Sequence, residues 1–173
     1  MYNGTGFLLT DKKDLLCNEE NRGTDMLSKK TQYAFKALMY LAQKPNNEPV
    51  LIAEISQQRN IPLKFLENIL LELKKQGILD SKKGKGGGYY LAKEPDKIIL
   101  ADVMRLIEGP IALLPCVSLH FYKQCGQCDE NHCGLHRIMI QVRDANLAIL
   151  ENKTVADISH SPVPVDMDCS ITQ

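Results

Sequence analysis

Three helical stretches separated by short turns are predicted in the first half of the chain. Apolar residues recur every three or four positions over residues 28–44 and 62–76, which is the period of an amphipathic helix. A shorter helix is expected over residues 51–58, followed by a turn at 59–61. Pro62 suits the first turn of the third helix, and Gly77 suits its left-handed end. The predicted buried stripe of this third helix contains Phe65, Leu66, Ile69, Leu70 and Leu73.

A β-hairpin is predicted directly after the third helix. Residues 78–83 form the expected first strand, 84–88 a glycine-rich turn, and 89–92 the returning strand. Three helices followed by a hairpin are the element order of a winged helix-turn-helix. The expected fold class is therefore mainly α, with a small β-hairpin wing and a long C-terminal dimerisation helix.

The second half of the chain contains two further amphipathic helices. One is expected over residues 100–108, and a longer one runs from 134 to about 151. The longer helix has apolar residues at alternating spacings of three and four, the pattern of a coiled-coil seam. The seam is formed by Leu135, Ile138, Val142, Ala145 and Ile149. We expect it to pair with a second copy of the chain, and the alternative is that it packs on its own domain.

These elements divide the chain into five segments. They are a disordered extension (1–26, with Met26 as a possible start), a winged helix-turn-helix domain (27–98), a connecting helix and cysteine loop (99–133), a dimerisation helix (134–153) and a disordered tail (154–173). The sequence contains neither the roughly 18 consecutive apolar residues of a membrane span nor a secretory signal. We expect a cytoplasmic protein that makes no contact with membranes.

Positive charge is concentrated in the predicted winged domain. Residues 28–97 contain 13 Lys and Arg against 7 Asp and Glu, whereas the whole chain has a net charge of zero. Local positive charge favours phosphate binding, although a solvated basic surface would show the same balance. In a helix-turn-helix the N-terminal residues of the second helix enter the major groove. The residues predicted to contact DNA are Lys30, Lys64, Phe65, Glu67, Asn68, Lys75, Lys82, Lys83, Lys85, Gly86, Gly87 and Tyr89.

The glycine-rich turn has two possible interpretations. Its glycines allow backbone to approach sugar and phosphate, its lysines supply charge, and Tyr89 anchors the returning strand. A nucleotide-binding loop would need a following helix and a Lys-Ser/Thr pair, which this turn lacks. The turn therefore favours a DNA-binding wing.

Four cysteines lie within 18 residues of the loop between the last two helices. Clustered thiols in a cytosolic protein indicate metal or redox chemistry, because such thiols are kept reduced. Four thiolates, or three with a histidine, could bind an iron–sulfur cluster. The same set could bind tetrahedral zinc or act as a metal-free thiol switch. The candidate ligands are Cys116, Cys125, Cys128, Cys133 and His136, whereas His120 and His132 are expected to be exposed.

The motifs together resemble the Rrf-two family of bacterial regulators over residues 26–152. Four motifs carry the resemblance: Ser28-Lys29-Lys30-x-x-Tyr33-Ala34, Ala53-Glu54-Ile55, Pro62-x-x-Phe65-Leu66-Glu67-x-Ile69-Leu70-x-x-Leu73 and Gly84-x-Gly86-Gly87-Gly88-Tyr89. The family includes an iron–sulfur cluster regulator, a nitric-oxide-sensing repressor and a cysteine-metabolism repressor. Cys133-Gly134-Leu135-His136 is similar to the Cys-x-x-His ending of the first, but the upstream spacing differs.

The resemblance implies a homodimer that binds a palindromic operator through crossed C-terminal helices. It also implies base recognition near Glu67 and a basic wing residue in the minor groove, a position that Lys83 occupies. The function predicted is a repressor whose operator affinity depends on an iron–sulfur cluster or on thiol oxidation. The sequence contains no conspicuous catalytic motif, so a metal-cluster enzyme is disfavoured. A zinc-stabilised or metal-free winged helix that binds protein is the alternative.

Overall fold

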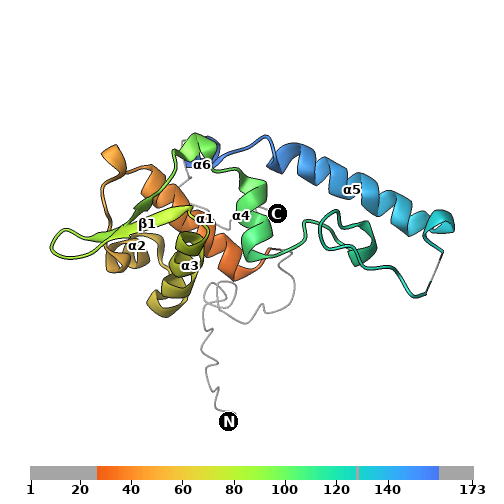
Figure 1. Cartoon of the computed structure of the whole chain (residues 1–173), viewed down its shortest axis with the longest axis horizontal. Helices are drawn as coiled ribbons and strands as arrows, with labels where there is room; N and C mark the ends of the chain where they lie inside the picture. Colours follow the sequence, from red (N-terminus) through yellow and green to blue (C-terminus); the bar gives the residue numbers. More distant parts are fainter. Residues whose placement is uncertain (1–26, 128, 160–173) are drawn as a thin grey trace, which may run out of the picture.

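The computed structural model describes residues 27–127 and 129–159 (Figure 1). The longer helices are α1 (Lys29–Ala42), α2 (Ile52–Arg59), α3 (Leu63–Lys75), α4 (Leu100–Ile107), α5 (Gly134–Leu150) and the short α6 (Val155–Ser159). Strands β1 (Leu79–Lys82) and β2 (Gly88–Leu91) form one antiparallel hairpin. Four 3₁₀ turns lie between them: η1 (Pro45–Asn47), η2 (Pro95–Lys97), η3 (Pro115–Val117) and η4 (Glu130–His132). No helix in these ranges is long and apolar enough to cross a membrane.

The ends of the first three helices follow from local sequence. The hydroxyl of Ser28 accepts a hydrogen bond from the N–H of Thr31 at 3.3 Å and so caps α1. Asn60 adopts a left-handed conformation at the end of α2, with a φ of 49°. Gly77 does the same after α3, with a φ of 67°, and its N–H donates to the Lys74 carbonyl. The predicted helix boundaries are therefore correct to within two residues.

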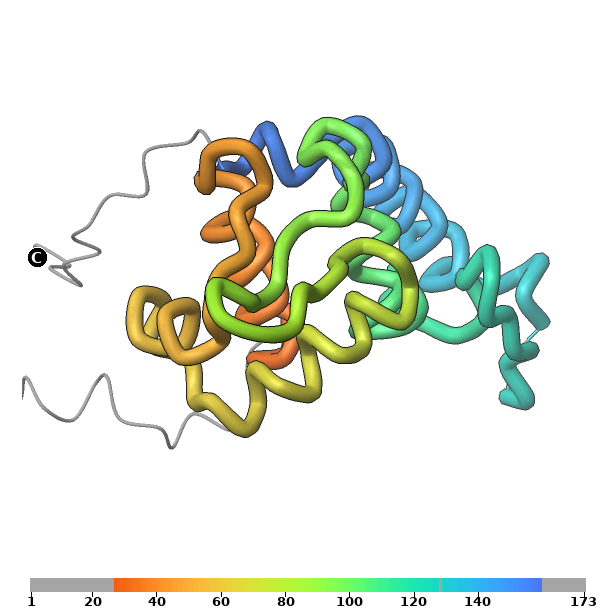
Figure 2. The backbone as a smooth tube through the Cα atoms, turned by 60° about the vertical axis from the view of Figure 1, so that its left-hand side comes forward, coloured from red at the N-terminus to blue at the C-terminus, as the bar shows by residue number. Residues whose placement is uncertain are grey.

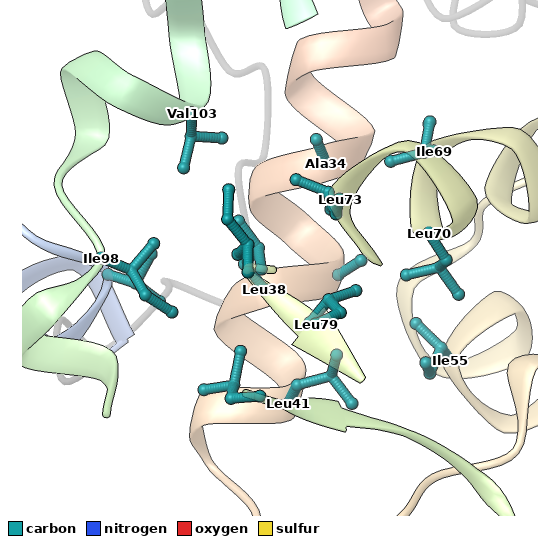
Figure 3. Packing of buried hydrophobic residues seen from close by; sticks show 14 of the residues in the cluster. Ala34, Leu38, Leu41, Ile55, Ile69, Leu70, Leu73, Leu79, Ile98 and Val103 are labelled. Carbon is teal, nitrogen blue, oxygen red and sulfur yellow. The ribbon is translucent and has the colours of Figure 1, made fainter. Parts of the chain in front are cut away.

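The core joins α1, α3, α4 and the hairpin (Figure 3). Leu38 of α1, Leu73 of α3 and Leu79 of β1 are buried at its centre. Val103 of α4 is also fully buried and contributes to the same cluster. Packing the first strand directly on α3 fixes the position of the hairpin relative to that helix.

A backbone bridge attaches the hairpin to the segment before α2. The N–H of Val50 donates to the carbonyl of Tyr89 at 2.9 Å, and the reverse bond measures 2.8 Å. Tyr89 is also half-buried against the core, as expected for an anchor of the returning strand. The base of the hairpin is thus held from two sides.

Helix α5 extends away from the body formed by α1–α3 and the hairpin (Figures 1 and 2). Leu147 is buried, and the Arg143 guanidinium donates to the Val117 carbonyl at 2.6 Å, which connects α5 to η3. The predicted seam is largely uncovered in the single chain, since the exposed fractions of Leu135, Ile138 and Ile149 are 58%, 51% and 64%. Packing of this seam back on its own domain is therefore not observed in the part of the chain that the structure describes.

Residues 154–159 are ordered, and the prediction that a disordered tail begins at residue 154 is wrong for them. The N–H of Val155 donates to the Ile98 carbonyl at 2.9 Å, and Val155 is fully buried. The Gln43 side chain also donates to the Ser159 carbonyl at 3.1 Å, which holds α6 against α1. The expected disorder of residues 1–26 and 160–173 lies outside the described residues.

Candidate DNA-binding surface and cysteine loop

The first turns of α3 present polar side chains to solvent. Lys64, Glu67 and Asn68 are exposed, as the sequence predicts. The opposite side of the helix is held by buried Leu66 and Ile69, so these polar groups lie on a fixed scaffold. Amine, carboxylate and amide groups in this position can form hydrogen bonds to base edges.

Phe65 does not belong to the buried stripe of α3. The prediction is wrong because 61% of this residue is exposed. Leu66, Ile69 and Leu70 occupy the centre of the stripe, and Phe65 lies at its edge in the first helical turn. Nothing in the described part of the chain covers the ring, which leaves it available to a ligand beside Lys64.

Three exposed lysines lie at the end of the hairpin, two of them in its tip and one at the end of β1. The last paired residues of the strands are Lys82 and Gly88, so residues 83–87 form the tip, which projects beyond the helices (Figure 1). Positive φ values of 95° at Gly84 and 75° at Gly86 produce the tight turn. Lys82, Lys83 and Lys85 are exposed, and within residues 27–127 and 129–159 no salt bridge to them is found.

Two glycines in the hairpin are required by close backbone contacts. A Cβ atom on Gly88 would lie 2.3 Å from the Val50 carbonyl oxygen, and one on Gly87 would lie 2.4 Å from the Lys82 carbonyl oxygen. Gly87 is buried, and its N–H already donates to the Gly84 carbonyl at 2.9 Å. Gly87 therefore shapes the tip, whereas exposed Gly86 leaves its backbone accessible.

The other basic residues near α3 differ in whether they already form a salt bridge within the protein. Lys30 forms a salt bridge with Glu72 of α3 at 2.6 Å. Lys74 is bound to Asp80 of β1 at 3.1 Å, whereas Lys75 is exposed. Lys75 is thus more accessible to a phosphate than either of the paired lysines.

The cysteine loop lies far from this surface. It surrounds the N-terminal end of α5, on the opposite side of the molecule from α3 and the hairpin tip (Figures 1 and 2). Cys116 lies on η3, Cys125 lies in the following loop, and Cys133 is the N-cap of α5. All three are half-buried, and Cys128 lies outside the described residues.

Three potential metal ligands converge at the start of α5. One donor atom each from Cys116, Glu130 and His136 lies within 4.8 Å of the other two. Cys133 is held nearby, because its sulfur accepts a hydrogen bond from the His136 N–H at 3.4 Å. The structure thus brings together Cys116 and His136, which are 20 residues apart in the sequence.

Glu130 was not predicted from the sequence. Its carboxylate accepts hydrogen bonds from the Tyr122 hydroxyl at 3.0 Å and from the Cys125 N–H at 3.0 Å. An acidic residue in a polar loop matches no ligand motif, so its spacing from the cysteines gave no signal. By contrast, His120 and His132 are exposed as predicted, and His132 contacts Asp129 rather than the cysteines.

Electrostatics at the loop favour a protonated Cys116 when no metal is bound. Burial raises the pKa of this thiol, and the Glu130 carboxylate and the Cys125 and Cys133 thiols raise it further. The hydrogen bond to Glu130 likewise raises the pKa of Tyr122. Only the thiolate is a good nucleophile, so metal-free Cys116 should react slowly with oxidants at neutral pH.

Comparison with known proteins identifies the family. Residues 27–161 match the family model Rrf2, described as an iron-dependent transcriptional regulator. The chain belongs to the Rrf2 family. The match includes α3, the hairpin, the cysteine loop and α5.

Individual relatives agree with the Rrf2 assignment. An rrf2-like HTH-type transcriptional regulator from Rhodobacter capsulatus is 36% identical, over 77% of this chain and 91% of that protein. The regulator NsrR from Shouchella clausii is 30% identical, over 76% of this chain and 87% of its own length. Among solved structures, the global cysteine regulator CymR of B. subtilis has a TM-score of 0.65 at 28% identity, over 77% of this chain and 95% of that chain.

These similarities establish the general class of the protein. This Rrf2 protein is a DNA-binding transcription regulator and not an enzyme, as the sequence predicts. The mainly helical winged helix-turn-helix fold is confirmed as well. The similarities do not identify which residues contact DNA or bind a metal.

The donor set of the loop fits a metal centre of the kind that the Rrf2 description implies. Thiolate and imidazole are ligands that iron–sulfur clusters and zinc accept. The His136 Nδ1 atom is buried and has no hydrogen-bond partner among the described residues. An unpartnered buried nitrogen is costly, and coordination of a metal would satisfy it. Cys116, Cys125, Cys133 and His136 are the described residues that would hold such a group.

Proposed function

We propose that this protein is a homodimeric repressor of a palindromic operator, controlled by an iron–sulfur cluster bound in the cysteine loop. The observation that carries the proposal is the position of the donor cluster, at the first turn of a helix whose apolar seam is uncovered. A metal bound there would act directly on the helix that we expect to join the two subunits. This assignment agrees with the iron-dependent description of the family.

Sequence recognition is assigned to the exposed start of α3. Lys64 can donate to guanine, Asn68 to adenine, and Glu67 can accept from cytosine. The exposed Phe65 ring suits contact with a thymine methyl group. Lys82, Lys83 and Lys85 supply positive charge to the sugar–phosphate backbone, with Lys83 directed toward the minor groove.

Dimerisation is assigned to α5. A coiled-coil seam left half-exposed in one chain requires a partner of matching pattern, and a second copy supplies it. Two copies related by a two-fold axis present two α3 helices to the two halves of a palindrome. The seam contains no charged residue, whereas polar and charged groups lie on the outer face of α5, and this distribution supports the pairing.

Control through the cluster follows from the connections of the loop. Cys116 on η3 and Cys133 at the start of α5 lie on the two sides of the loop that joins α4 to α5. A cluster bound by both would restrain this joint, and its loss or oxidation would release it. The change would alter the relative placement of the two α3 helices and hence operator affinity. In a metal-free thiol switch the attacking thiolate would have to come from another cysteine of the loop, because the raised pKa of Cys116 makes that thiol a poor nucleophile.

Removal of the wing charges tests the DNA-binding role. The double variant Lys83→Ala, Lys85→Ala should weaken operator binding roughly ten-fold or more, and it should do so for unrelated DNA sequences as well. The slope of log K against log salt should become shallower by up to about 4 per dimer, since about 1 is lost for each phosphate contact. Gel shifts at several salt concentrations measure both quantities.

Lys93→Ala, Lys97→Ala is the matched control, because it removes the same charge from exposed positions near η2. It should leave operator affinity nearly unchanged. Glu67→Ala should instead change the sequence preference of the protein. Equal losses in the two double variants would show that the wing lysines have no specific role.

The cluster is tested by purification without oxygen. The protein should have visible absorbance and contain iron and acid-labile sulfide, and both should be lost in Cys125→Ala. Cys169→Ala removes a cysteine outside the loop and should retain the colour. A colourless anaerobic protein with stoichiometric zinc would contradict the cluster and favour a structural zinc site.

A further inference from the structure

We infer that Cys116, Glu130 and His136 form a site for a single divalent transition-metal ion, which binds without sulfide. This inference rests on the proposed metal-binding role of the loop. It adds Glu130 to the metal ligands of the loop, and it adds a form of the protein in which the loop binds one metal ion and no cluster.

The spacing of the three donors is that of one ion. Ligands bound to one tetrahedral ion at about 2.0–2.3 Å lie roughly 3.3–3.8 Å from one another. The donor atoms of Cys116, Glu130 and His136 all lie within 4.8 Å of one another, so shifts of the order of 1 Å would close the site. An iron in a cluster is bonded mainly to sulfide and accepts one or two protein ligands, so three side chains bound to one ion describe a separate state that forms when sulfide is absent.

The chemistry of the donors selects the class of metal. One thiolate, one carboxylate and one imidazole suit Zn²⁺ and Fe²⁺, whereas Ca²⁺ and Mg²⁺ require oxygen ligands. Three protein ligands leave a fourth tetrahedral position open to water or to another thiol of the loop. Because Cys116, Glu130 and His136 are only half-buried, the bound ion could exchange with solvent.

Neighbouring groups hold the carboxylate in place. Glu130 accepts from the Tyr122 hydroxyl and from the Cys125 N–H, and its two oxygens retain further lone pairs for a metal. Such outer hydrogen bonds orient a metal ligand before the ion arrives. The unpartnered Nδ1 of His136 is the second sign that the site is prepared for a ligand, as judged from the described residues.

Binding would connect three separate elements. Cys116 belongs to η3, Glu130 to η4 and His136 to the first turn of α5. The Arg143 bond to the Val117 carbonyl already attaches η3 to the middle of α5. An ion would add a second attachment at the end of the helix, so the metal would stiffen the loop without a cluster.

Titration of the reduced, metal-free full-length protein with Co²⁺ under anaerobic conditions, with no sulfide present, tests the site. We expect one Co²⁺ per chain, with visible d–d bands of a four-coordinate ion and a thiolate charge-transfer band. Glu130→Gln keeps an oxygen that can accept from Cys125 but removes the anionic ligand. It should weaken Co²⁺ binding at least about 10-fold, the lower end of what loss of an outer-shell partner costs. Competition with Zn²⁺ and Fe²⁺ then ranks the two physiological ions.

Asp129→Asn is the matched control. It removes one negative charge from the adjacent residue, and asparagine retains the ability to cap η4. Its Co²⁺ affinity should stay within about two-fold of the wild-type value. Equal affinity of Glu130→Gln and the wild type, or absence of Co²⁺ binding, would overturn the inference.

Reconstitution of the same variants with iron and sulfide separates this result from the proposed function. If the wild type and Glu130→Gln assemble the same cluster and also bind Co²⁺ with equal affinity, or do not bind it at all, only the mononuclear site fails. If no cluster forms in any variant while Co²⁺ binding depends on Glu130, the cluster fails and the mononuclear site stands.

Discussion

Ile138→Asp is expected to give a monomeric protein whose operator affinity is lower by about two to four orders of magnitude. Ile138 is the second of the five residues of the uncovered α5 seam, and 51% of it is exposed in the single chain. In a dimer its side chain would be buried, where an unpaired carboxylate is strongly unfavourable. A monomer engages one half of a palindrome, and loss of the linked second contact costs roughly 10²–10⁴ in affinity.

Light scattering coupled to gel filtration measures the subunit number, and a gel shift measures the affinity. Ala148→Asp is the control, because it introduces the same charge on α5 outside the seam. Ala148 is exposed and lies about 100° around the helix from the seam residue Ile149. This variant should remain a dimer and bind the operator normally. A dimeric Ile138→Asp protein with full affinity would mean that another surface joins the subunits.

Gly88→Ala is expected to destabilise the winged domain by about 2–6 kcal/mol. A Cβ atom at this position would lie 2.3 Å from the Val50 carbonyl oxygen, and the φ of 153° is one that residues with a side chain rarely adopt. Backbone strain of about 1–3 kcal/mol adds to an overpacking cost of about 1–3 kcal/mol. Relief of this contact requires the bridge between Val50 and Tyr89 to shift or break, which would loosen the attachment of the wing to the segment before α2.

Chemical denaturation measures the free energy of unfolding, and a gel shift records the effect on DNA binding. Gly134→Ala is the control, because no atom lies within 4 Å of the Cβ position at this glycine. Its free energy of unfolding should change by less than about 1 kcal/mol. If Gly88→Ala were as stable as Gly134→Ala, the Val50–Tyr89 bridge would not hold the wing in solution.

The principal elements were predictable because each has a strong local signal. The period of apolar residues in α1, α3 and α5 fixes the buried face of a helix without knowledge of its partners. Asn60 and Gly77 mark the ends of α2 and α3, since each occupies a left-handed position. The glycine and lysine pattern of residues 83–88 likewise predicts the hairpin tip.

The failures occurred where packing decides the outcome. The spacing of Phe65 fits the buried stripe, yet the ring is exposed because no other element within residues 27–127 and 129–159 covers the first turn of α3 on that side. Val155 has no periodic pattern around it, yet it is buried because the Ile98 backbone binds this segment to the core. Neither result can be inferred from one segment alone.

The sequence by itself determined the winged fold, the basic wing, the seam of α5 and the presence of a thiol cluster. These depend on periodicity, turn chemistry and composition, which are properties of neighbouring residues. Only the tertiary structure decided that Cys116, Glu130 and His136 converge and that Gly88 contacts the Val50 backbone. Such contacts join residues up to 38 positions apart, and their distances depend on how whole elements pack against one another.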